Sequence, residues 1–134
     1  MDHVEYSMRE PVDDDQLSAL HALAFRHAGV SIPWNERLTQ HSLFWVTARQ
    51  DEALIGFVNV IGDGGAHAVL LDLCVHPQAQ GRRIGRTLFR AAADEARRRG
   101  CHWLHADYEP HLTRFYEQHC GLQSTAAGLL DLRT

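Results

Sequence analysis

The chain has 134 residues, 45% of them hydrophobic and 22% charged, values that fit one globular domain and exclude disordered, collagenous and fibrous proteins. Its formal net charge of −4 disfavours a general nucleic-acid or anionic-membrane partner. The three cysteines have no regular spacing, which predicts reduced thiols in a cytoplasmic protein. The first segment is neither basic nor apolar, so we expect no signal peptide. No run of about 18 apolar residues occurs, so we expect no membrane span.

The first part of the chain predicts one strand and two helices. Val4–Met8 alternates weakly between polar and apolar residues, which favours a strand. Asp13-Asp14-Asp15 supplies N-cap carboxylates to a helix that we expect Gly29 to end. The residues that indicate this helix follow at helical spacing: Leu17, Leu20, His21 and Ala24. A proline then breaks the chain before a short helix over Trp34–Thr39.

The next part predicts three strands joined by short turns. Leu43–Arg49, Leu54–Ile61 and His67–Val75 are rich in β-branched and aromatic residues. Polar residues at 50–52 and the run Gly62-Asp63-Gly64-Gly65 are turn signals between them. We therefore expect an antiparallel meander.

An amphipathic helix over Gly85–Arg99 follows, and Gly100 stands where a C′ glycine is expected. Its predicted buried stripe is Leu88, Phe89, Ala92 and Ala96. Its predicted i,i+4 ion pairs are Arg90–Asp94, Asp94–Arg98 and Glu95–Arg99. A short strand over Cys101–Ala106 comes next, and the order strand, helix, strand predicts a right-handed crossover between two parallel strands.

The end of the chain predicts one more helix and two short strands. Pro110 can start a helix that runs through His119 and stops at Gly121. Leu122–Gln123 and Leu129–Leu132 are then expected to form a closing strand pair.

Three arginines, Arg82, Arg83 and Arg86, stand where the strand ending at Val75 passes through a loop into the next helix. The first N–H groups of a helix lack partners within it, and the helix dipole adds partial positive charge, so such an end suits a pyrophosphate. The alternative is a solvated helix start. The loop is neither a Walker A motif, because no Gly-Lys-Ser/Thr follows, nor G-x-G-x-x-G, because Gly81 and Gly85 are four apart.

Two motifs in order resemble the GNAT superfamily of N-acetyltransferases. Gln80 and Gly85 match the first and last positions of its acetyl-CoA loop, Gln/Arg-x-x-Gly-x-Gly/Ala, and Val75-His76-Pro77 matches the strand exit before that loop. Phe115–Leu122 resembles the helix end Phe-Tyr-x-x-x-Gly-Phe of the family. The order of strands and helices also agrees over nearly the whole chain.

The resemblance implies one GNAT domain over residues 1–134, an α/β fold whose mixed, mostly antiparallel sheet has six or seven strands flanked by about four helices. It implies acetyl-CoA as the acyl donor, without a metal, in the cleft where the fourth and fifth strands splay apart. The positions that it assigns to cofactor binding are the strand end Leu73, Cys74 and Val75 and the loop and helix start Gln80, Gly81, Arg82, Arg83, Ile84, Gly85, Arg86 and Thr87. It assigns to Tyr116 the role of acid for the thiolate leaving group.

The chain departs from the family pattern at two positions. Arg83 replaces the internal glycine of the loop, and we expect ordinary helical or turn geometry there, in which Arg83 keeps its N–H and adds a phosphate contact. Glu109 stands where the family often has an asparagine, which leaves one customary CoA contact without its usual side chain.

Asp72 is a carboxylate inside an otherwise apolar strand, where alternation places it on one face with Leu70 and Cys74. A buried, unpaired carboxylate is unfavourable, so Asp72 needs a partner or a function. By resemblance to GNAT enzymes that hold or deprotonate the acceptor amine with an acidic residue here, Asp72 is a catalytic candidate, and a structural ion pair is the alternative. Asp107 and Glu109 are weaker candidates for the same role.

Other reactive side chains have simpler interpretations. Cys74 is expected to be a small buried hydrophobe rather than an acyl acceptor. The histidines and cysteines after residue 100 fit no regular zinc pattern. His67 and His105 are candidate proton carriers, and Trp34 is expected beside the acceptor. The tryptophans expected in the core or a pocket wall are Trp34, Trp45 and Trp103.

The predicted function is transfer of an acetyl group from acetyl-CoA to a primary amine of a small molecule or peptide, by direct attack of the neutral amine. A non-catalytic acyl-CoA-binding or sensor module of the same fold is the first alternative. A nucleic-acid binder that uses the arginine-rich helix is the second, and the acidic remainder disfavours it. Beyond acetyl-CoA and an unidentified amine, the sequence predicts no nucleic-acid or membrane partner and leaves a homodimer open.

Overall fold

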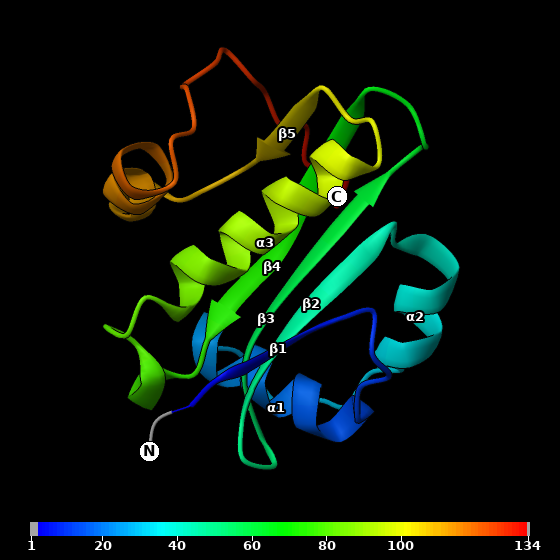
Figure 1. Cartoon of the computed structure of the whole chain (residues 1–134), viewed down its shortest axis with the longest axis vertical. Helices are drawn as coiled ribbons and strands as arrows, with labels where there is room; N and C mark the ends of the chain where they lie inside the picture. Colours follow the sequence, from blue (N-terminus) through cyan, green and yellow to red (C-terminus); the bar gives the residue numbers. More distant parts are fainter. Residues whose placement is uncertain (1–2, 134) are drawn as a thin grey trace.

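The computed structural model of the chain describes residues 3–133, so residues 1, 2 and 134 of the predicted domain lie outside the described part. The strands and helices are shown in Figure 1. They are β1 (Glu5–Met8), α1 (Asp14–Phe25), α2 (Trp34–His41), β2 (Phe44–Gln50), β3 (Ala53–Gly62), β4 (His67–Val75), α3 (Ile84–Arg98) and β5 (Trp103–Ala106). Every predicted element up to β5 is present, with small differences at its ends. None of the helices in residues 3–133 has the length and apolar character that crossing a bilayer requires.

The strands form one five-stranded sheet in the order β1-β2-β3-β4-β5. Neighbouring strands are antiparallel except β4 and β5, which are parallel. The predicted meander and the predicted parallel pair are therefore confirmed. α3 makes the longer connection that two parallel strands require.

The predicted closing strand pair does not form. Residues 121–133 contain no helix or strand, and Leu129, Leu130 and Leu132 are 85%, 84% and 84% exposed. A short strand persists only when it pairs with a neighbour and buries one face, and this segment does neither. The sheet therefore has five strands instead of six or seven.

The last predicted helix, from Pro110 to His119, is divided. It consists of a 3₁₀ turn over Pro110–Leu112 and a π-helical segment over Arg114–His119. The N–H of Cys120 reaches the carbonyl of Phe115 at 3.0 Å, which is the wide bond of a π-helical turn. Such turns are frequent at functional sites, and this one carries Tyr116.

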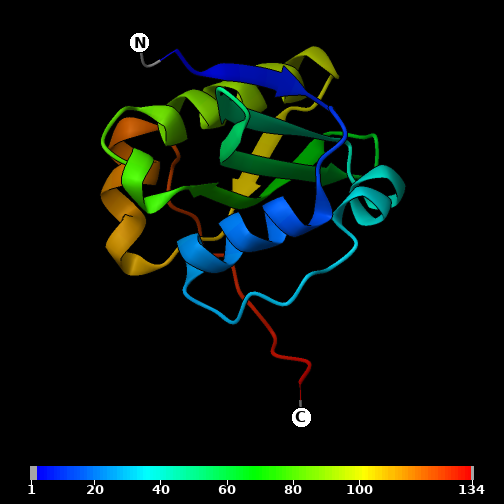
Figure 2. The ribbon, with the colours of Figure 1, turned by 90° about the horizontal axis from the view of Figure 1, so that it is seen from below.

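The helices lie on both faces of the sheet, α1 and α2 on one and α3 on the other (Figure 2). Alternate side chains of β2 separate the two faces, because Val46 and Ala48 pack in the cluster with α3 and Trp45 packs in the cluster with α1 and α2. The predicted stripe of α3 is buried: Leu88, Phe89, Ala92 and Ala96. Gly56 of β3 permits this close packing, since a Cβ there would lie 2.9 Å from the Cδ1 of Leu88.

The ion pairs of α3 are only partly as predicted, and their central residue Glu95 is buried. Glu95 pairs with Arg99 at 2.8 Å, as expected, and also with Arg98 at 2.8 Å. Asp94 pairs with Arg97 at 3.1 Å, so the predicted pairs of Asp94 with Arg90 and Arg98 are wrong. Partners three residues apart are as close on a helix surface as partners four apart, and here they prevail. The helix ends before Gly100, whose φ is +90°, as predicted.

α1 begins as predicted but ends earlier. The Asp13 carboxylate accepts a hydrogen bond from the N–H of Gln16 at 2.9 Å, which caps the first turn. Arg26 ends the helix in the left-handed conformation, with φ 56° and ψ 53°, so Gly29 lies beyond the helix and does not end it. The left-handed residue turns the chain back, and the N–H of Ile32 reaches the Oγ of Ser18 at 3.1 Å.

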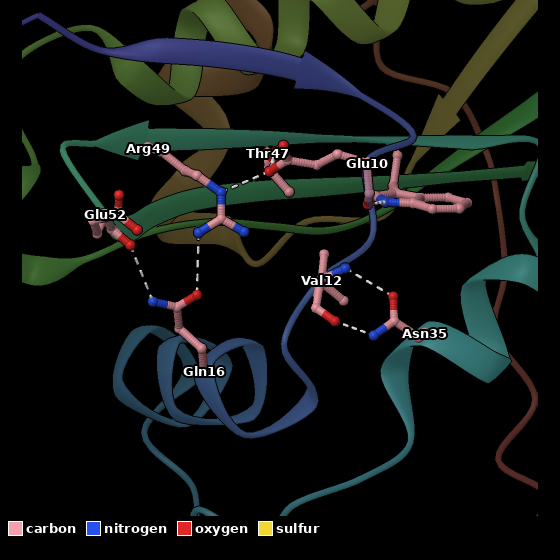
Figure 3. A network of polar contacts seen from close by, with 8 residues as sticks. Glu10, Val12, Gln16, Asn35, Thr47, Arg49 and Glu52 are labelled. Carbon is pink, nitrogen blue, oxygen red and sulfur yellow. Dashed lines mark hydrogen bonds and ion pairs between the residues drawn. The ribbon is translucent and has the colours of Figure 1, made fainter.

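A polar network ties the segment before α1 to the sheet (Figure 3). Glu10 accepts hydrogen bonds from the Oγ1 of Thr47 at 2.6 Å and the Nε of Arg49 at 2.7 Å. Arg49 also donates to the side chain of Gln16 in α1 at 3.1 Å. Burial acts to raise the pKa of Glu10, but the bonds from Thr47 and Arg49 outweigh it, so the pKa lies below its ordinary value.

α2 is attached to the same segment through Asn35. Its side chain accepts from the N–H of Val12 at 2.8 Å and donates to the carbonyl of Val12 (Figure 3). The N–H of Asn35 donates to the carboxylate of Asp14 at 2.9 Å. These bonds fix α1 and α2 relative to each other on one face of the sheet.

Candidate active site

β4 parts from β5 halfway along its length. The two strands pair from His67 opposite Trp103 to Leu70 opposite Ala106, where β5 ends, while β4 continues to Val75. The end of β4 thus has β3 as a neighbour on one side and no β5 strand on the other. This segment contains the predicted strand-end positions Leu73, Cys74 and Val75. Its open backbone edge can offer an N–H to an acyl oxygen.

A β-bulge at Asp72 shapes this end of β4. Two residues of β4 stand opposite the single residue Val58 of β3, and Asp72 has a left-handed φ of 59°. The bulge interrupts the alternation, so Leu70 packs in the cluster under α3 and Cys74 in the cluster under α1. The prediction that Asp72 shares a face with both is therefore wrong. Asp72 lies on the α1 face, where its Oδ1 is 3.0 Å from the Nε2 of His21.

The loop before α3 contains two left-handed residues. Gly81 has a φ of +83°, with open space where a Cβ would be, and Arg83 has a φ of 62°. The expectation of ordinary helical or turn geometry at Arg83 is wrong, because this N-cap residue holds the conformation for which the family uses glycine. Arg83 adopts this conformation as the N-cap of α3, and a non-glycine residue does so at a cost of about 1–2 kcal/mol.

The first turn of α3 presents N–H groups that have no partner in the helix. Its first hydrogen bond runs from the N–H of Thr87 to the carbonyl of Arg83 at 3.0 Å. The N–H groups of Ile84, Gly85 and Arg86 precede that bond and point out of the helix end. The helix dipole adds partial positive charge at the same place, so this end is suited to a phosphate.

Some side chains of the loop hydrogen-bond to other parts of the protein, and others do not. Gln80 donates to the carbonyl of Val75 at 3.4 Å, and Arg82 donates to Gln50 at 3.1 Å. The guanidinium groups of Arg83 and Arg86 form no hydrogen bond or ion pair with any residue from 3 to 133. These two exposed cations, rather than Arg82, are therefore free to meet an anion.

α3 meets the C-terminal motif at Gly85. A Cβ on Gly85 would lie 3.4 Å from the ring of Phe115 and 3.6 Å from a methyl of Val75. The strand exit, the loop and the C-terminal segment, which resemble three parts of one family pattern, thus contact each other in space.

Tyr116 is buried beside the open end of β4. Its side chain is 7% exposed and stacks on the ring of Tyr108 with 4.8 Å between centroids. Burial, followed by electrostatic interaction with Cys120 and Cys74, raises the pKa of Tyr116 to about 12. The hydroxyl is therefore protonated at neutral pH, and it forms no hydrogen bond with another residue of the part of the chain that the structure describes.

A small cavity of about 160 Å³ lies on the α1 side of Asp72. Residues from α1, the α1–α2 loop, α2 and β4 line it: Ser18, His21, His27, Val30, Ile32, Trp34, Arg37 and Asp72. The guanidinium of Arg37 lies over the ring of Trp34, 4.9 Å from its centroid. Trp34 is thus a pocket wall, as predicted.

Three hydrogen bonds in series lead from this cavity toward solvent. Asp72 Oδ1 is 3.0 Å from His21 Nε2, His21 Nδ1 is 2.7 Å from His27 Nε2, and His27 Nδ1 is 2.8 Å from the carbonyl of Ala28. The side chains of Asp72 and His21 are each 20% exposed, whereas His27 is exposed. The Oδ2 of Asp72 is buried and has no hydrogen-bond partner among residues 3–133.

His21 and His27 were not among the functional residues predicted from the sequence. They are six residues apart, so on a continuous helix their side chains would point in different directions. The left-handed Arg26 ends α1 between them and turns the chain back, which brings the two rings together. Two histidines on either side of a helix end would have been the only signal, and it is a weak one.

The other predicted candidates lie away from this cavity. His67 and His105 hydrogen-bond each other at 2.8 Å at the start of β4, at the opposite end of the strand from Val75. Asp107 and Glu109 are exposed. Trp103 is 62% exposed, so its predicted place in the core or a pocket wall is wrong, because it begins an edge strand that no further layer covers.

The cysteines are free thiols, at positions 74, 101 and 120. Burial, followed by the charge of Asp72, raises the pKa of Cys74, which is 4% exposed and packs as a small apolar side chain. Within residues 3–133 no three histidine, cysteine or acidic residues are grouped so that they could hold a metal ion.

Comparison with known families gives one match. The model of the Acetyltransferase (GNAT) family matches residues 7–122. The matched span contains the open end of β4, the loop before α3 and the segment that carries Tyr116.

Solved structures share the fold. A probable acetyltransferase of unknown function from methicillin-resistant Staphylococcus aureus has 20% identity and a TM-score of 0.82 over 98% of this chain and 100% of its own. An acetyltransferase from Trypanosoma brucei has 16% identity and a TM-score of 0.83 over 97% of this chain and 100% of its own. An aminoglycoside N-acetyltransferase in complex with CoA has 19% identity and a TM-score of 0.78 over 98% of this chain and 95% of its own. At these identities the similarity shows the fold.

Proposed function

Because the chain belongs to the GNAT family of N-acetyltransferases, we propose that it transfers an acetyl group from acetyl-CoA to a primary amine of a small molecule. The observation that carries this proposal is the open end of β4 beside the first turn of α3. A backbone edge for an acyl group and a helix end for a pyrophosphate lie next to each other there.

The residues of this region fit acetyl-CoA. The N–H groups of Ile84, Gly85 and Arg86 and the free guanidinium groups of Arg83 and Arg86 would hold the pyrophosphate. The backbone of residues 73–75 would hold the acetyl and pantetheine groups. When bound, acetyl-CoA supplies the activated thioester.

Two side chains act on the reacting groups in this proposal. Asp72 holds the acceptor amine, since its carboxylate lines the cavity and its side chain is 20% exposed. Tyr116 has a pKa of about 12, which makes it a weaker acid than an ordinary thiol with a pKa of about 8.5. Tyr116 therefore serves first as a hydrogen-bond donor that stabilises the leaving thiolate, which refines its predicted role as an acid.

The size of the cavity favours a small acceptor. At about 160 Å³ it is smaller than the roughly 300–1,000 Å³ of a typical ligand pocket. A compact amine can place its nitrogen near Asp72 within this volume, whereas a peptide segment would have to lie largely outside it. We therefore favour a small molecule over a peptide.

The proposal is tested by measuring CoA thiol release from acetyl-CoA with a panel of small primary amines. We expect amine-dependent thiol release by the wild type. The double variant Arg83→Glu with Arg86→Glu should lose most of this release, because its two new negative charges repel the pyrophosphate. Arg97→Glu is the matched control, since Arg97 is 74% exposed near the other end of α3. Tight CoA binding without transfer to any amine would instead support the sensor module, and absence of CoA binding would overturn the donor.

A further inference from the structure

The hydrogen bonds among Asp72, His21, His27 and Ala28 fix how many protons the two imidazole rings hold when every bond is made. The carbonyl of Ala28 can only accept, so the Nδ1 of His27 donates to it. An ionised Asp72 can only accept, so the Nε2 of His21 donates to it. The bond between the rings requires one proton more. The full set of bonds therefore needs three protons on two rings, which is one positive charge.

The same set of bonds is incomplete when both rings are neutral. Two neutral imidazoles carry two protons, so one of the three hydrogen bonds lacks its proton. Uptake of a proton by His21 and His27 completes the series, and the negative charge of Asp72 compensates the positive charge that results. The arrangement is thus suited to receive a proton from the side of Asp72.

The surroundings of the histidine pair give this transfer a direction. Arg37 from α2 lines the same cavity and opposes additional positive charge there. Burial, followed by the negative charge of Asp72, raises the pKa of Cys74, so Cys74 stays a neutral thiol. Exposure increases from Asp72 and His21, each 20% exposed, to the exposed His27, so a proton entering at the cavity can leave at the surface.

From these contacts we propose that Asp72 receives the acceptor ammonium and that His21 and His27 carry its proton to solvent. This inference rests on the acetyl transfer proposed above. Asp72 touches the substrate and is the catalytic residue, whereas the two histidines act through it as positioning residues that carry the proton.

The step balances in atoms and charge. One N–H bond of the ammonium breaks, its proton passes through Asp72 to the histidine pair, and the outer proton of His27 passes to water. The freed lone pair forms the C–N bond while the C–S bond of the thioester breaks and its electron pair leaves on sulfur. The second amine proton ends on that sulfur, which gives the amide and the free thiol of CoA.

The test compares two acceptors of similar size in the full-length protein, ethylamine and 2,2,2-trifluoroethylamine. Ethylamine is protonated at pH 7 and needs a base, whereas trifluoroethylamine is already neutral. With ethylamine we expect His21→Gln to lower kcat/KM by ~100-fold and His27→Gln by ~10-fold. With trifluoroethylamine we expect losses below ~3-fold, and the loss with ethylamine should shrink as the pH rises towards 9.

His67→Gln is the matched control, because it breaks the other histidine pair, whose rings hydrogen-bond at 2.8 Å at the far end of β4, compared with 2.7 Å between His21 and His27. Its kcat/KM should equal that of the wild type. Equal losses in His21→Gln with both amines at every pH would show a merely structural role and overturn the relay. Wild-type rates in His21→Gln would overturn the proton relay but not the proposed acetyl transfer. A wild type that transfers acetyl to neither amine would contradict the proposed function itself.

Discussion

Replacing Arg83 by glycine separates the backbone role of this position from its role in anion binding. Arg83 is the N-cap of α3, with φ 62° and ψ 18°. Relief of the left-handed conformation stabilises the fold by about 1–2 kcal/mol, and the greater freedom of glycine in the unfolded chain offsets about 0.5–1 kcal/mol of that. The net gain of about 0.5–1 kcal/mol corresponds to a rise in Tm of about 2–4 °C for a chain of 134 residues.

The same substitution should weaken CoA binding. It removes one charge-assisted contact worth about 1.5–3 kcal/mol, so the Kd for CoA should rise by about 10- to 150-fold. Thermal melts followed by circular dichroism and calorimetric titration with CoA measure the two effects separately. We thus expect Arg83→Gly to be more stable than the wild type and to bind CoA less tightly.

Arg26→Gly is the control for this experiment. Arg26 has the same left-handed conformation, with a φ of 56°, at the end of α1 and away from the loop. It should gain similar stability without a change in the Kd for CoA. A lower Tm in Arg83→Gly, or CoA binding as tight as in the wild type, would refute the reasoning.

Three further substitutions test other parts of the structure. Because the folded-state pKa of Glu10 is lowered, its carboxylate stabilises the fold above the ordinary glutamate pKa, and this contribution is lost as the pH falls through the lowered value. In urea melts, Glu10→Gln should lower the free energy of unfolding at pH 7 by about 1 kcal/mol. The free energy of unfolding should also change less with pH in the acid range than it does in the wild type. An unchanged pH dependence would contradict this. Gly56→Val should destabilise the protein by about 1–3 kcal/mol in the same assay, because its Cβ would lie 2.9 Å from Leu88, and wild-type stability would show that α3 does not pack this closely. Steady-state kinetics should show that Tyr116→Phe lowers kcat by about 10- to 100-fold while the Kd for CoA stays the same, and unchanged kcat would remove Tyr116 from the reaction.

Periodicity and glycine position made α3 predictable from the sequence. The apolar stripe of this helix and the C′ Gly100 are strong signals, because an amphipathic helix must bury one face against the sheet. The runs of β-branched and aromatic residues in β2, β3 and β4 predicted these strands equally clearly, and the short turns between them permit an antiparallel meander. The loop before α3 could be recognised by its spacing and its neighbours.

Left-handed residues that are not glycine account for most of what the sequence did not reveal. Arg83, Arg26 and Asp72 each redirect the chain at a position where the side chain gives no such signal. Arg26 brings His27 back to His21, and Asp72 reverses the side-chain alternation of β4. The His21–His27 contact exists only in three dimensions, so no local pattern could indicate it.

The CoA-binding site is tested most directly by an amide chemical-shift titration of the full-length protein with CoA. The central claim is that CoA binds along the open end of β4 and the first turn of α3. We therefore expect the largest shifts in residues 73–75 and in the N–H groups of Ile84, Gly85 and Arg86. Absent shifts, or shifts concentrated at His67 and His105 on the far end of the sheet, would contradict it.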